Sequence, residues 1–300
     1  MELSVVISTL NDRERLLASL DALSNRTPDD TEVIVVNGPS SDGTTGAVRE
    51  RDDVDVLVEI SERSSPVSRN AGLEVARGSV VAFLGGEYAV DPTWYDAIES
   101  GIRRGAEVIT GPVSGGTTPS IDPKRPKTVA RRKVTLFDGD NVAFDRAVLE
   151  ELDGFDEYVS SGDADDCAHR VAGLGFDVTW NAEMSVRSEV GTDGGHSTDG
   201  PGNTYRSLAY RLTKNYGPRP TIVARCVGSV IRGGITSARA VASGDGTPTD
   251  WAGNGTTVVT NLFVGFRDGI RARYADRATR RNPHGLSARH DRAVQLYDRR

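Results

Sequence analysis

The chain has 300 residues, of which 37% are hydrophobic and 26% are charged, a mixture typical of a folded, soluble protein with one large core or two modest ones. Its two cysteines, Cys167 and Cys226, lie far apart without a CxxC pair or a nearby histidine, which argues against a disulfide framework and against a zinc site. The apolar run 3–10 has no basic leader, and no segment approaches the roughly 18 uncharged apolar residues of a membrane-spanning helix. We therefore expect a protein in the cytoplasm or peripherally at the cytoplasmic face of the cell membrane.

The charges are unevenly distributed along the chain. Residues 1–200 contain 19 Lys and Arg against 37 Asp and Glu, whereas residues 201–300 contain 17 against 6. Such a basic region is typical of proteins that meet an acidic surface such as lipid head groups, although it can also dock on its own acidic domain. We expect no nucleic-acid partner, because the region lacks interleaved aromatic residues and a known reader motif. The chain is also rich in Asp and poor in Lys, as are proteins of salt-loving archaea.

The first third of the chain alternates apolar runs with amphipathic stretches. The expected strands are 3–8, 33–36, 54–60 and 80–84, and the expected helices are 16–23, 43–50, 68–77 and 92–102. Such alternation predicts an α/β fold with a mainly parallel sheet that is covered by helices on both faces. Ligands bind beyond the carboxyl ends of such strands, so the tips to inspect are 8–11, 37–43 and 85–87.

A glycine-rich segment, residues 191–202, divides the rest of the chain. Residues 112–135, with a basic cluster at 124–133, are expected to form a long loop. Strands at 141–145 and 177–180 and helices at 147–152 and 164–174 are then expected to complete a domain of residues 1–200. Residues 201–300 are expected to form a basic, mainly helical C-terminal region, with helices at 205–216, 222–242 and 258–274. Arginines among apolar residues favour either helices that lie on a membrane surface or ordinary packing against the main domain.

Five segments carry a family resemblance. In chain order they are VVISTLNDRERLLASLDAL, VIVVNGPSSDGT, SRNAGLEVARGSVVAFL, DPTW and DNVAFDRAVLEELDGFDE. Together they resemble family 2 glycosyltransferases, inverting enzymes of the GT-A fold, over about residues 3–190. Residues 200–300 resemble the tails of haloarchaeal glycosyltransferases that build lipid-linked N-glycans. The resemblance implies a GT-A fold, which is a Rossmann-like, mainly parallel sheet flanked by helices, and a nucleotide-sugar donor.

The resemblance places the donor at the strand tips. Thr9 and Asn11 follow the first strand, where the family contacts the nucleoside, and Asn37 stands where the family usually has an aspartate that binds a pyrimidine. An amide can also accept a hydrogen bond there, and the alternative is that Asn37 only permits a turn. Arg69 and Asn70 lie near a helix start, where a guanidinium and the positive helix end suit a diphosphate; the alternative is a surface salt bridge.

The segment Gly85-Gly86-Glu87 stands where the family usually carries two or three aspartates that hold a divalent metal against the diphosphate. Glycines replace the first of them, so Glu87 is the remaining candidate metal ligand, and Gly86 is expected to lie against the donor. One carboxylate with phosphates and water binds Mg²⁺ or Mn²⁺ only weakly.

Arg187 stands in the region where the family often supplies another metal ligand, a histidine. A guanidinium cannot ligate a metal, but it can neutralise a leaving diphosphate. We therefore hypothesise that Arg187 and Arg69 have taken over part of the role of the metal. His196 is a rival metal ligand, and its alternative interpretation is a solvated loop histidine.

Inversion at the anomeric carbon requires a base that deprotonates the acceptor hydroxyl. The family places it in a Glu-Asp pair at the start of a helix that contains an arginine. Counting back from Arg170 puts Asp163 at the Glu position and Ala164 at the Asp position. Asp163 or Asp165 is therefore the expected base, with Asp163 preferred because it begins the helix. The alternative is that these aspartates only favour a helix N-terminus.

The sequence thus predicts a glycosyltransferase that moves a sugar from a nucleotide to a lipid-linked glycan at the membrane surface. By resemblance, the acceptor is a dolichol-phosphate glycan of protein N-glycosylation, and a hexuronic acid is one candidate donor sugar. The altered metal motif and the shifted base position leave an alternative, in which a catalytically inactive relative binds a nucleotide or a partner enzyme without turnover.

Overall fold

The computed structural model describes residues 1–115, 126–188, 201–242 and 248–300. Its first elements are β1 Leu3–Thr9, α1 Arg13–Ser24, β2 Glu32–Asn37, α2 Thr44–Arg49, β3 Val56–Ile60, α3 Ser65–Val75, β4 Val80–Gly85, β5 Ala89–Val90, α4 Trp94–Arg103, β6 Val108–Thr110 and β7 Val113–Ser114. The later elements are β8 Lys127–Val129, β9 Arg132–Val134, β10 Asn141–Asp145, α5 Arg146–Leu152, α6 Asp163–Leu174, β11 Val178–Trp180, β12 Val186–Arg187, α7 Pro201–Tyr216, α8 Pro220–Ala242, α9 Pro248–Ala275, a short 3-10 turn Leu286–Ala288 and β13 Ala293–Asp298.

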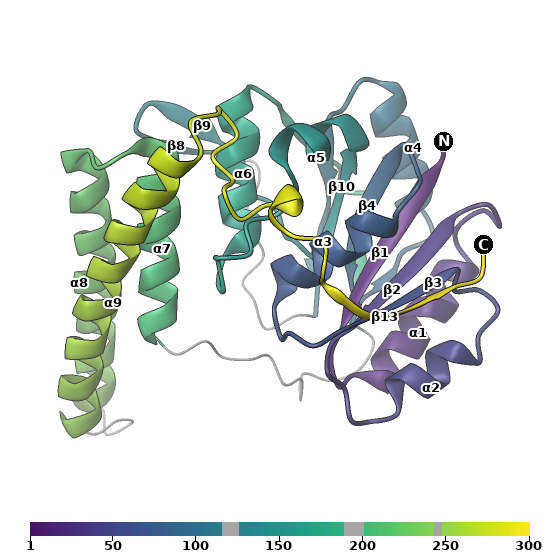
Figure 1. Ribbon diagram of the computed structural model, residues 1–300, viewed down its shortest axis with the longest axis horizontal. Coiled ribbons are helices and arrows are strands. Elements are labelled where there is room, and N and C mark those ends of the chain that lie inside the picture. Colours follow the sequence, from purple (N-terminus) through teal and green to yellow (C-terminus); the bar gives the residue numbers. More distant parts are fainter. Residues whose placement is uncertain (116–125, 189–200, 243–247) are drawn as a thin grey trace.

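The centre of the molecule is an eight-stranded sheet with the strand order β11-β6-β10-β4-β1-β2-β3-β13 (Figure 1). Strands β4, β1, β2 and β3 are parallel, whereas β10 and β13 run against their neighbours. The sheet is therefore mixed but mainly parallel, which confirms the predicted α/β fold. In this register Thr9 lies opposite Asn37 and Ser8 opposite Gly85, so the three predicted tips lie along one edge of the sheet.

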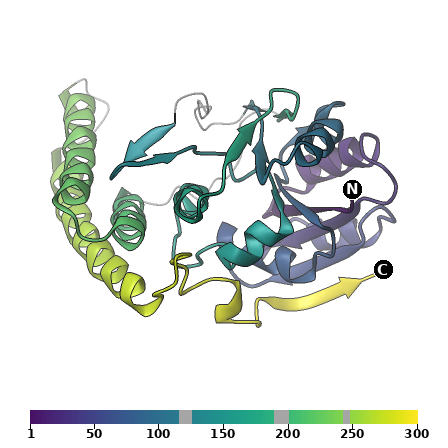
Figure 2. The same cartoon turned by 90° about the horizontal axis from the view of Figure 1, so that it is seen from above.

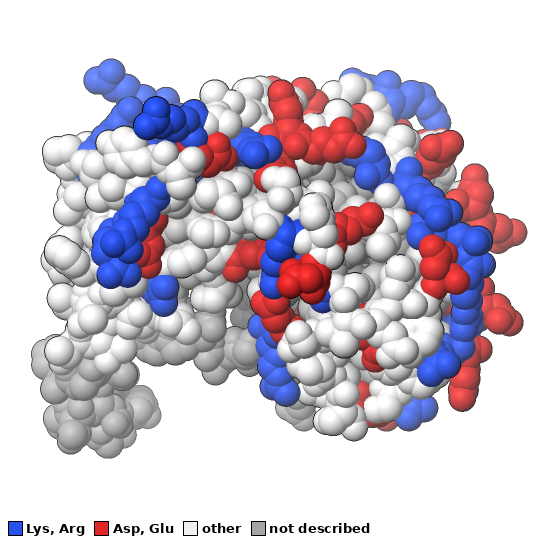
Figure 3. Space-filling view, in the orientation of Figure 1, with Lys and Arg blue, Asp and Glu red and all other residues white. Residues whose placement is uncertain are grey.

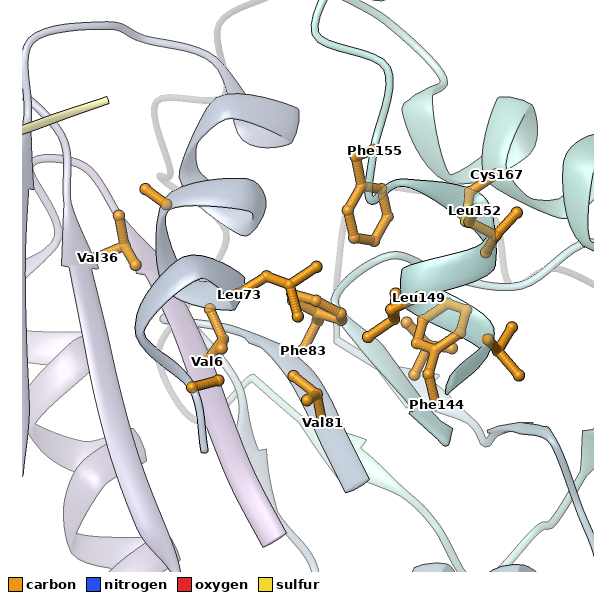
Figure 4. Packing of buried hydrophobic residues seen from close by; sticks show 14 of the residues in the cluster. Val6, Val36, Leu73, Val81, Phe83, Phe144, Leu149, Leu152, Phe155 and Cys167 are labelled. Atoms are coloured by element: carbon orange, nitrogen blue, oxygen red, sulfur yellow. The ribbon is translucent and has the colours of Figure 1, made fainter. Parts of the chain in front are cut away.

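Each face of the sheet has its own hydrophobic core, because side chains alternate along every strand. On β1, Val6 belongs to one core, while Val5 and Ile7 belong to the other. The core with Val6 packs under α3, α5 and α6, where Phe83, Phe144 and Phe155 meet edge to face (Figure 4). The second core packs under α1 and α4.

Helix α3 lies directly on the sheet and carries two of the predicted site residues. A Cβ atom at Gly72 would lie 2.3 Å from Val6 Cγ1, so only glycine allows this close approach. The helix begins at Ser65, earlier than the predicted start at residue 68, with Pro66 in its first turn. Arg69 and Asn70 are consequently buried in the body of the helix.

The segment 112–135, predicted as a long loop, contains more structure than expected. Strands β8 and β9 form a two-stranded hairpin, and β7 joins β5 and β12 in a small three-stranded sheet. The first two residues of the basic cluster, Lys124 and Arg125, lie outside the described residues.

The C-terminal helices α7, α8 and α9 stand together beside the sheet, with α7 against α6 (Figures 1 and 2). The contact between α6 and α7 contains a fully buried ionic network. The Lys214 ammonium donates to the carboxylates of Asp156 and Asp166, and Arg170 donates to Asp166 at 2.9 Å. Burial alone would raise the pKa of Asp166, but Lys214 and Arg170 outweigh it and hold that pKa at about 2. No helix of the described part is long and apolar enough to span a bilayer.

The chain after α9 returns to the sheet, where β13 pairs antiparallel with β3. Figure 2 shows this segment running along the outside of the molecule to the C-terminus. On its way, the buried Arg292 forms ion pairs with Glu74 and Glu157. Asn282 donates to the backbone carbonyl of Asp153 at 2.8 Å. Strand β13 was not among the strands predicted from the sequence.

The buried His169 of α6 generates a prediction about pH. Its Nδ1 lies 2.7 Å from the hydroxyl of Tyr216, and burial lowers the pKa of the imidazole to about 4 from an ordinary value of 6.5. Because unfolding lets this imidazole take up a proton below pH 6.5, acid favours the unfolded state. We expect the free energy of unfolding to lose about 2 kcal/mol through His169 between pH 7 and pH 5.

Urea unfolding at both pH values would measure this loss. His169→Asn should flatten the pH dependence by that amount. An equally steep fall in the His169→Asn protein would contradict the assignment.

Candidate active site

Two asparagines hold the turns that follow β1 and β2. The Asn11 side-chain oxygen accepts a hydrogen bond from the backbone N–H of Ser41 at 2.8 Å, and Asn11 has a left-handed backbone with φ of 51°. The buried Asn37 donates to Thr45 at 3.0 Å and accepts from Ser40 at 2.7 Å. Both amides therefore stabilise turns, and their contact with a nucleoside stays a prediction.

Thr9 and Gly86 lie side by side at the tips of β1 and β4. The Thr9 residue is only 8% exposed, and its hydroxyl has no hydrogen-bond partner among the described residues. A Cβ atom at Gly86 would lie 3.0 Å from the Ser8 carbonyl oxygen and 3.4 Å from Thr9 Oγ1. An unpaired buried hydroxyl costs about 1–3 kcal/mol, and a ligand that forms a hydrogen bond with it would recover this free energy.

Arg69 connects three separate elements at this edge. Its side chain is 6% exposed and forms ion pairs with Asp140, just before β10, at 2.8 Å, and with Asp163, the first residue of α6. Burial would lower the pKa of the guanidinium, but Asp163 and Asp140 outweigh it and raise that pKa above its ordinary value. Arg69 is therefore permanently charged, and its charge is shared between two carboxylates.

Asp138 and Asp140 were not singled out in the sequence analysis. They precede β10, and the antiparallel pairing of β10 with β4 brings them to the tip that carries Glu87. Burial, reinforced by the Asp140 carboxylate, raises the pKa of Asp138. Burial and the carboxylates of Glu87, Asp140 and Asp138 also raise the pKa of Tyr88. The triplet Asp138-Gly139-Asp140 before the predicted strand 141–145 is the sequence feature that could have drawn attention to these residues. The sequence did not predict the direction of that strand, so it could not place the triplet beside the tip of β4.

The acidic residues at the tip offer a metal ion few protein ligands. Among the described residues, no group of three or more His, Cys, Asp or Glu side chains is close enough to hold one. Glu87 and Asp140 can supply one or two carboxylates, which is enough for Mg²⁺ or Mn²⁺ when phosphates and water complete the shell. The residues therefore fit a cation that binds together with a diphosphate. His196 lies outside the described residues.

The remaining predicted residues are each held by another part of the chain. Asn70 is fully buried, donates to the Phe155 carbonyl at 2.9 Å and accepts from the Phe155 N–H at 2.8 Å. Asp165 pairs with Arg211 of α7 at 2.7 Å.

Arg187, on β12 beside Ala89, is exposed and pairs with Asp91. The structure thus brings Thr9, Asn37, Gly86, Glu87, Arg69 and Asp163 to one edge of the sheet, while Asp165 and Arg187 form ion pairs with residues outside this group. The roles of all these residues in binding or catalysis stay predictions.

Comparisons with known proteins bear on the family and the fold of the chain. Residues 4–152 match the model of glycosyl transferase family 2. Glycosyltransferase AglE of Haloferax volcanii is 26% identical over 194 residues, which is 59% of this chain, and the chain spans only 63% of the length of that relative.

Two solved structures show the same fold. The Pyrobaculum calidifontis mannosyltransferase PcManGT, in complex with GDP-Man and Mn²⁺, has a TM-score of 0.57 at 19% identity, with 91% of this chain and 84% of that chain covered. Residues 1–349 of S. aureus TarS, in complex with UDP-GlcNAc, give a TM-score of 0.63 at 16% identity, with 92% of each chain covered.

The unpartnered Thr9 hydroxyl leads to a prediction with an internal control. Thr9→Val removes a hydroxyl that no described residue satisfies, so the melting temperature should stay the same or rise. Binding of a nucleotide sugar should weaken about tenfold, which corresponds to about 1.4 kcal/mol. Calorimetric titration and thermal unfolding would measure the two effects.

The control is Thr110→Val in the same sheet. The Thr110 hydroxyl is fully buried and donates to the Asn141 carbonyl at 2.7 Å, so its loss should destabilise the fold by about 1–2 kcal/mol. Equal destabilisation by both substitutions would show that the Thr9 hydroxyl is satisfied within the protein.

Proposed function

Because the chain belongs to glycosyl transferase family 2, we propose that it transfers a sugar, with inversion, from a nucleotide-sugar donor to a lipid-linked glycan. The observation that carries the proposal is the edge of the sheet that carries the unpaired Thr9 hydroxyl, Gly86 packed against Thr9, and the buried Arg69. Open α/β sheets bind ligands beyond such strand ends. The Pyrobaculum structure, with GDP-Man and Mn²⁺, and the S. aureus structure, with UDP-GlcNAc, support a nucleotide-sugar donor and a divalent cation.

The proposed chemistry is a single displacement. A carboxylate takes the proton of the acceptor hydroxyl as the hydroxyl oxygen attacks the anomeric carbon, and the bond from that carbon to the diphosphate oxygen breaks on the opposite side. The nucleoside diphosphate leaves with the bonding electron pair. Asp163 is the favoured base, because its ion pair with Arg69 places it at the edge that carries Thr9 and Gly86, whereas the arginine partner of Asp165, Arg211, belongs to α7 outside this group. The Arg69 guanidinium holds Asp163 in place through their ion pair.

Two features of the chain favour a specific donor sugar and a specific acceptor glycan. The similarity to AglE of Haloferax volcanii and the Asp-rich, Lys-poor composition support a role in a salt-loving archaeon. Together with the resemblance of residues 200–300, they favour a dolichol-phosphate glycan of protein N-glycosylation as the acceptor. A hexuronic acid is the donor sugar to test first, beside neutral hexoses and N-acetylhexosamines.

Two aspartate variants test the base. Asp163→Asn and Asp165→Asn each remove one ion pair with an arginine, and thermal unfolding of both variants controls for the loss of the more deeply buried pair of Asp163 with Arg69. With a panel of UDP- and GDP-sugars and extracted glycolipids, Asp163→Asn should lower kcat by about 10²–10⁴ and leave donor affinity within a few fold. Asp165→Asn should retain most of the activity.

If Asp165→Asn lowers kcat more than Asp163→Asn does, Asp165 is the base. If the variant with both substitutions keeps full activity, neither aspartate is the base. Donor binding by the unaltered protein without transfer to any acceptor would instead favour the inactive relative.

We further propose that α8 and α9 rest on the membrane that holds the acceptor. On α8, four apolar side chains recur every fourth residue and are exposed, namely Val223, Val227, Ile231 and Ile235. On α9, Phe263 is 77% exposed and lies one turn from the exposed Arg267. Figure 3 shows that the face carrying α9 is mostly uncharged, with basic side chains and little acidic surface. Apolar side chains with neighbouring arginines suit an anionic lipid surface.

Vesicle sedimentation tests this surface. The protein should bind vesicles of phosphatidylglycerol more strongly than vesicles of phosphatidylcholine, and Ile231→Ser combined with Phe263→Ser should weaken binding at least fivefold. Val294→Ser, at a residue that is 69% exposed on β13, is the matched control and should bind normally. If the double variant instead converts a stable dimer to a monomer, the surface binds a second copy of the chain and the membrane proposal fails.

A further inference from the structure

Two arginines from distant parts of the chain lie against the last turn of α7. Arg132 of β9 stacks over Tyr216, with its Cζ atom 5.1 Å from the centre of the ring. Arg273 of α9 donates to the backbone carbonyls of Lys214 and Asn215, at 2.9 Å and 3.2 Å. These carbonyls carry the partial negative charge of a helix C-terminus, which helps to hold the guanidinium of Arg273 there.

Two further arginines join this group where the chain leaves α7. Gly217 follows the helix with a φ of 80°, and a Cβ atom there would lie 3.4 Å from Arg273 Nε. Arg219, two residues later, is exposed, and Arg281 donates to the Arg273 carbonyl at 3.0 Å. Figure 3 shows basic side chains gathered over the end of α9, at the upper left of the molecule. We call these four residues the arginine cluster.

The arginine cluster has no carboxylate to balance it. Among the described residues, none of its four guanidiniums forms an ion pair, although the whole chain has 43 Asp and Glu against 36 Lys and Arg. The Asp276 carboxylate, in the same segment as Arg281, pairs with a different arginine. Burial, reinforced by the charges of Arg281, Arg219 and Arg132, lowers the pKa of Arg273. The four cations therefore lie close enough to repel one another.

The arginine cluster is separate from the edge proposed to bind the donor. Arg132 Nη1 donates to the His169 carbonyl at 3.2 Å, and a Cβ atom at Gly173 would lie 2.8 Å from it. Gly173 is in the last turn of α6, whereas Asp163 begins that helix. At 1.5 Å per residue, the two ends of α6 are about 15 Å apart. A ligand of the cluster would thus occupy a second site.

We propose that the arginine cluster, Arg132, Arg219, Arg273 and Arg281, binds a doubly charged phosphate group, such as a phosphate monoester. The planar fork of a guanidinium matches two phosphate oxygens, and repulsion among the four cations falls when a dianion lies between them. The inference does not rest on sugar transfer, because it concerns residues outside the proposed donor site.

The neighbours of the arginine cluster favour a lipid as the source of the phosphate. The Arg219 carbonyl accepts the N–H of Val223 at 3.1 Å, so the cluster adjoins the exposed apolar residues of α8. Tyr274, which directly follows Arg273, is 66% exposed. Apolar and aromatic side chains beside arginines are typical of the head-group level of a membrane. Free phosphate offers the same chemistry, so the experiment has an arm for each source.

A phosphorus NMR titration with inorganic phosphate tests the site without turnover. A chelator keeps divalent cations from drawing phosphate to the donor edge. The unaltered protein should bind phosphate, and Arg219→Gln, at an exposed side chain, should weaken binding about fivefold without lowering the melting temperature. Arg219→Lys should retain part of the affinity. Arg271→Gln removes the same charge from a side chain that is 71% exposed on α9, and as the matched control it should bind normally.

Vesicle sedimentation identifies the source. Vesicles of phosphatidylcholine with phosphatidic acid, which carries a phosphate monoester, are compared with vesicles that contain phosphatidylglycerol at the same surface charge. Stronger binding to phosphatidic acid that is lost in Arg219→Gln would support a lipid. Equal binding to both vesicles, together with binding of inorganic phosphate, would support a free phosphate at the same site.

Two results would overturn the inference. One is an unaltered protein that binds neither inorganic phosphate nor phosphatidic acid in preference to phosphatidylglycerol. The other is equal weakening by Arg219→Gln and Arg271→Gln, which would mean that binding follows the overall surface charge. In both cases donor binding at the sheet edge and the proposed transfer would be unaffected.

Discussion

The buried guanidinium of Arg69 is the interaction on which the rest of the site depends. A charge that is removed from water is tolerated only when partners of opposite sign surround it. Asp140 and Asp163 provide that compensation from two different elements, so α3, the segment before β10 and α6 are fixed relative to one another. Gly139 makes this possible, because a Cβ atom there would lie 2.7 Å from the Arg69 guanidinium. The charge of Arg69 thus positions both the proposed base, Asp163, and the edge proposed to bind the donor.

The sequence was most informative where the signals are local. Alternating strands and helices predicted the parallel tips at Thr9, Asn37 and Gly86, because apolar periodicity within one element is sufficient for that inference. The importance of Asp140 could not be predicted in the same way. It depends on the direction and register of β10 against β4, which long-range packing decides. Strand β13 was missed for a related reason, because its residues are mostly exposed and acquire a strand conformation only through pairing with β3.

The C-terminal region is tied to the rest of the protein by buried charges. Lys214 of α7 lies between Asp156 and Asp166 with no exposure, and the buried Arg292 binds Glu74 of α3. Breaking such a pair by removing one partner typically costs about 3–5 kcal/mol, so these contacts specify one arrangement of the helices. The boundary at residue 200 stays a prediction. The sequence suggested a separate C-terminal region because residues 201–300 are basic. Two of these basic residues, Lys214 and Arg292, bind carboxylates of the acidic part of the chain.

Strand β13 also constrains the order in which the chain can fold during synthesis. The edge of β3 stays without its outer neighbour until residues 293–298 have left the ribosome, after every other element has been made. An unpaired edge strand is a template for pairing with another chain, and contacts between distant segments form slowly. The nascent protein therefore passes through a stage in which its main sheet is nearly complete but open at one side. Chaperones would determine how many molecules pass this stage without aggregating.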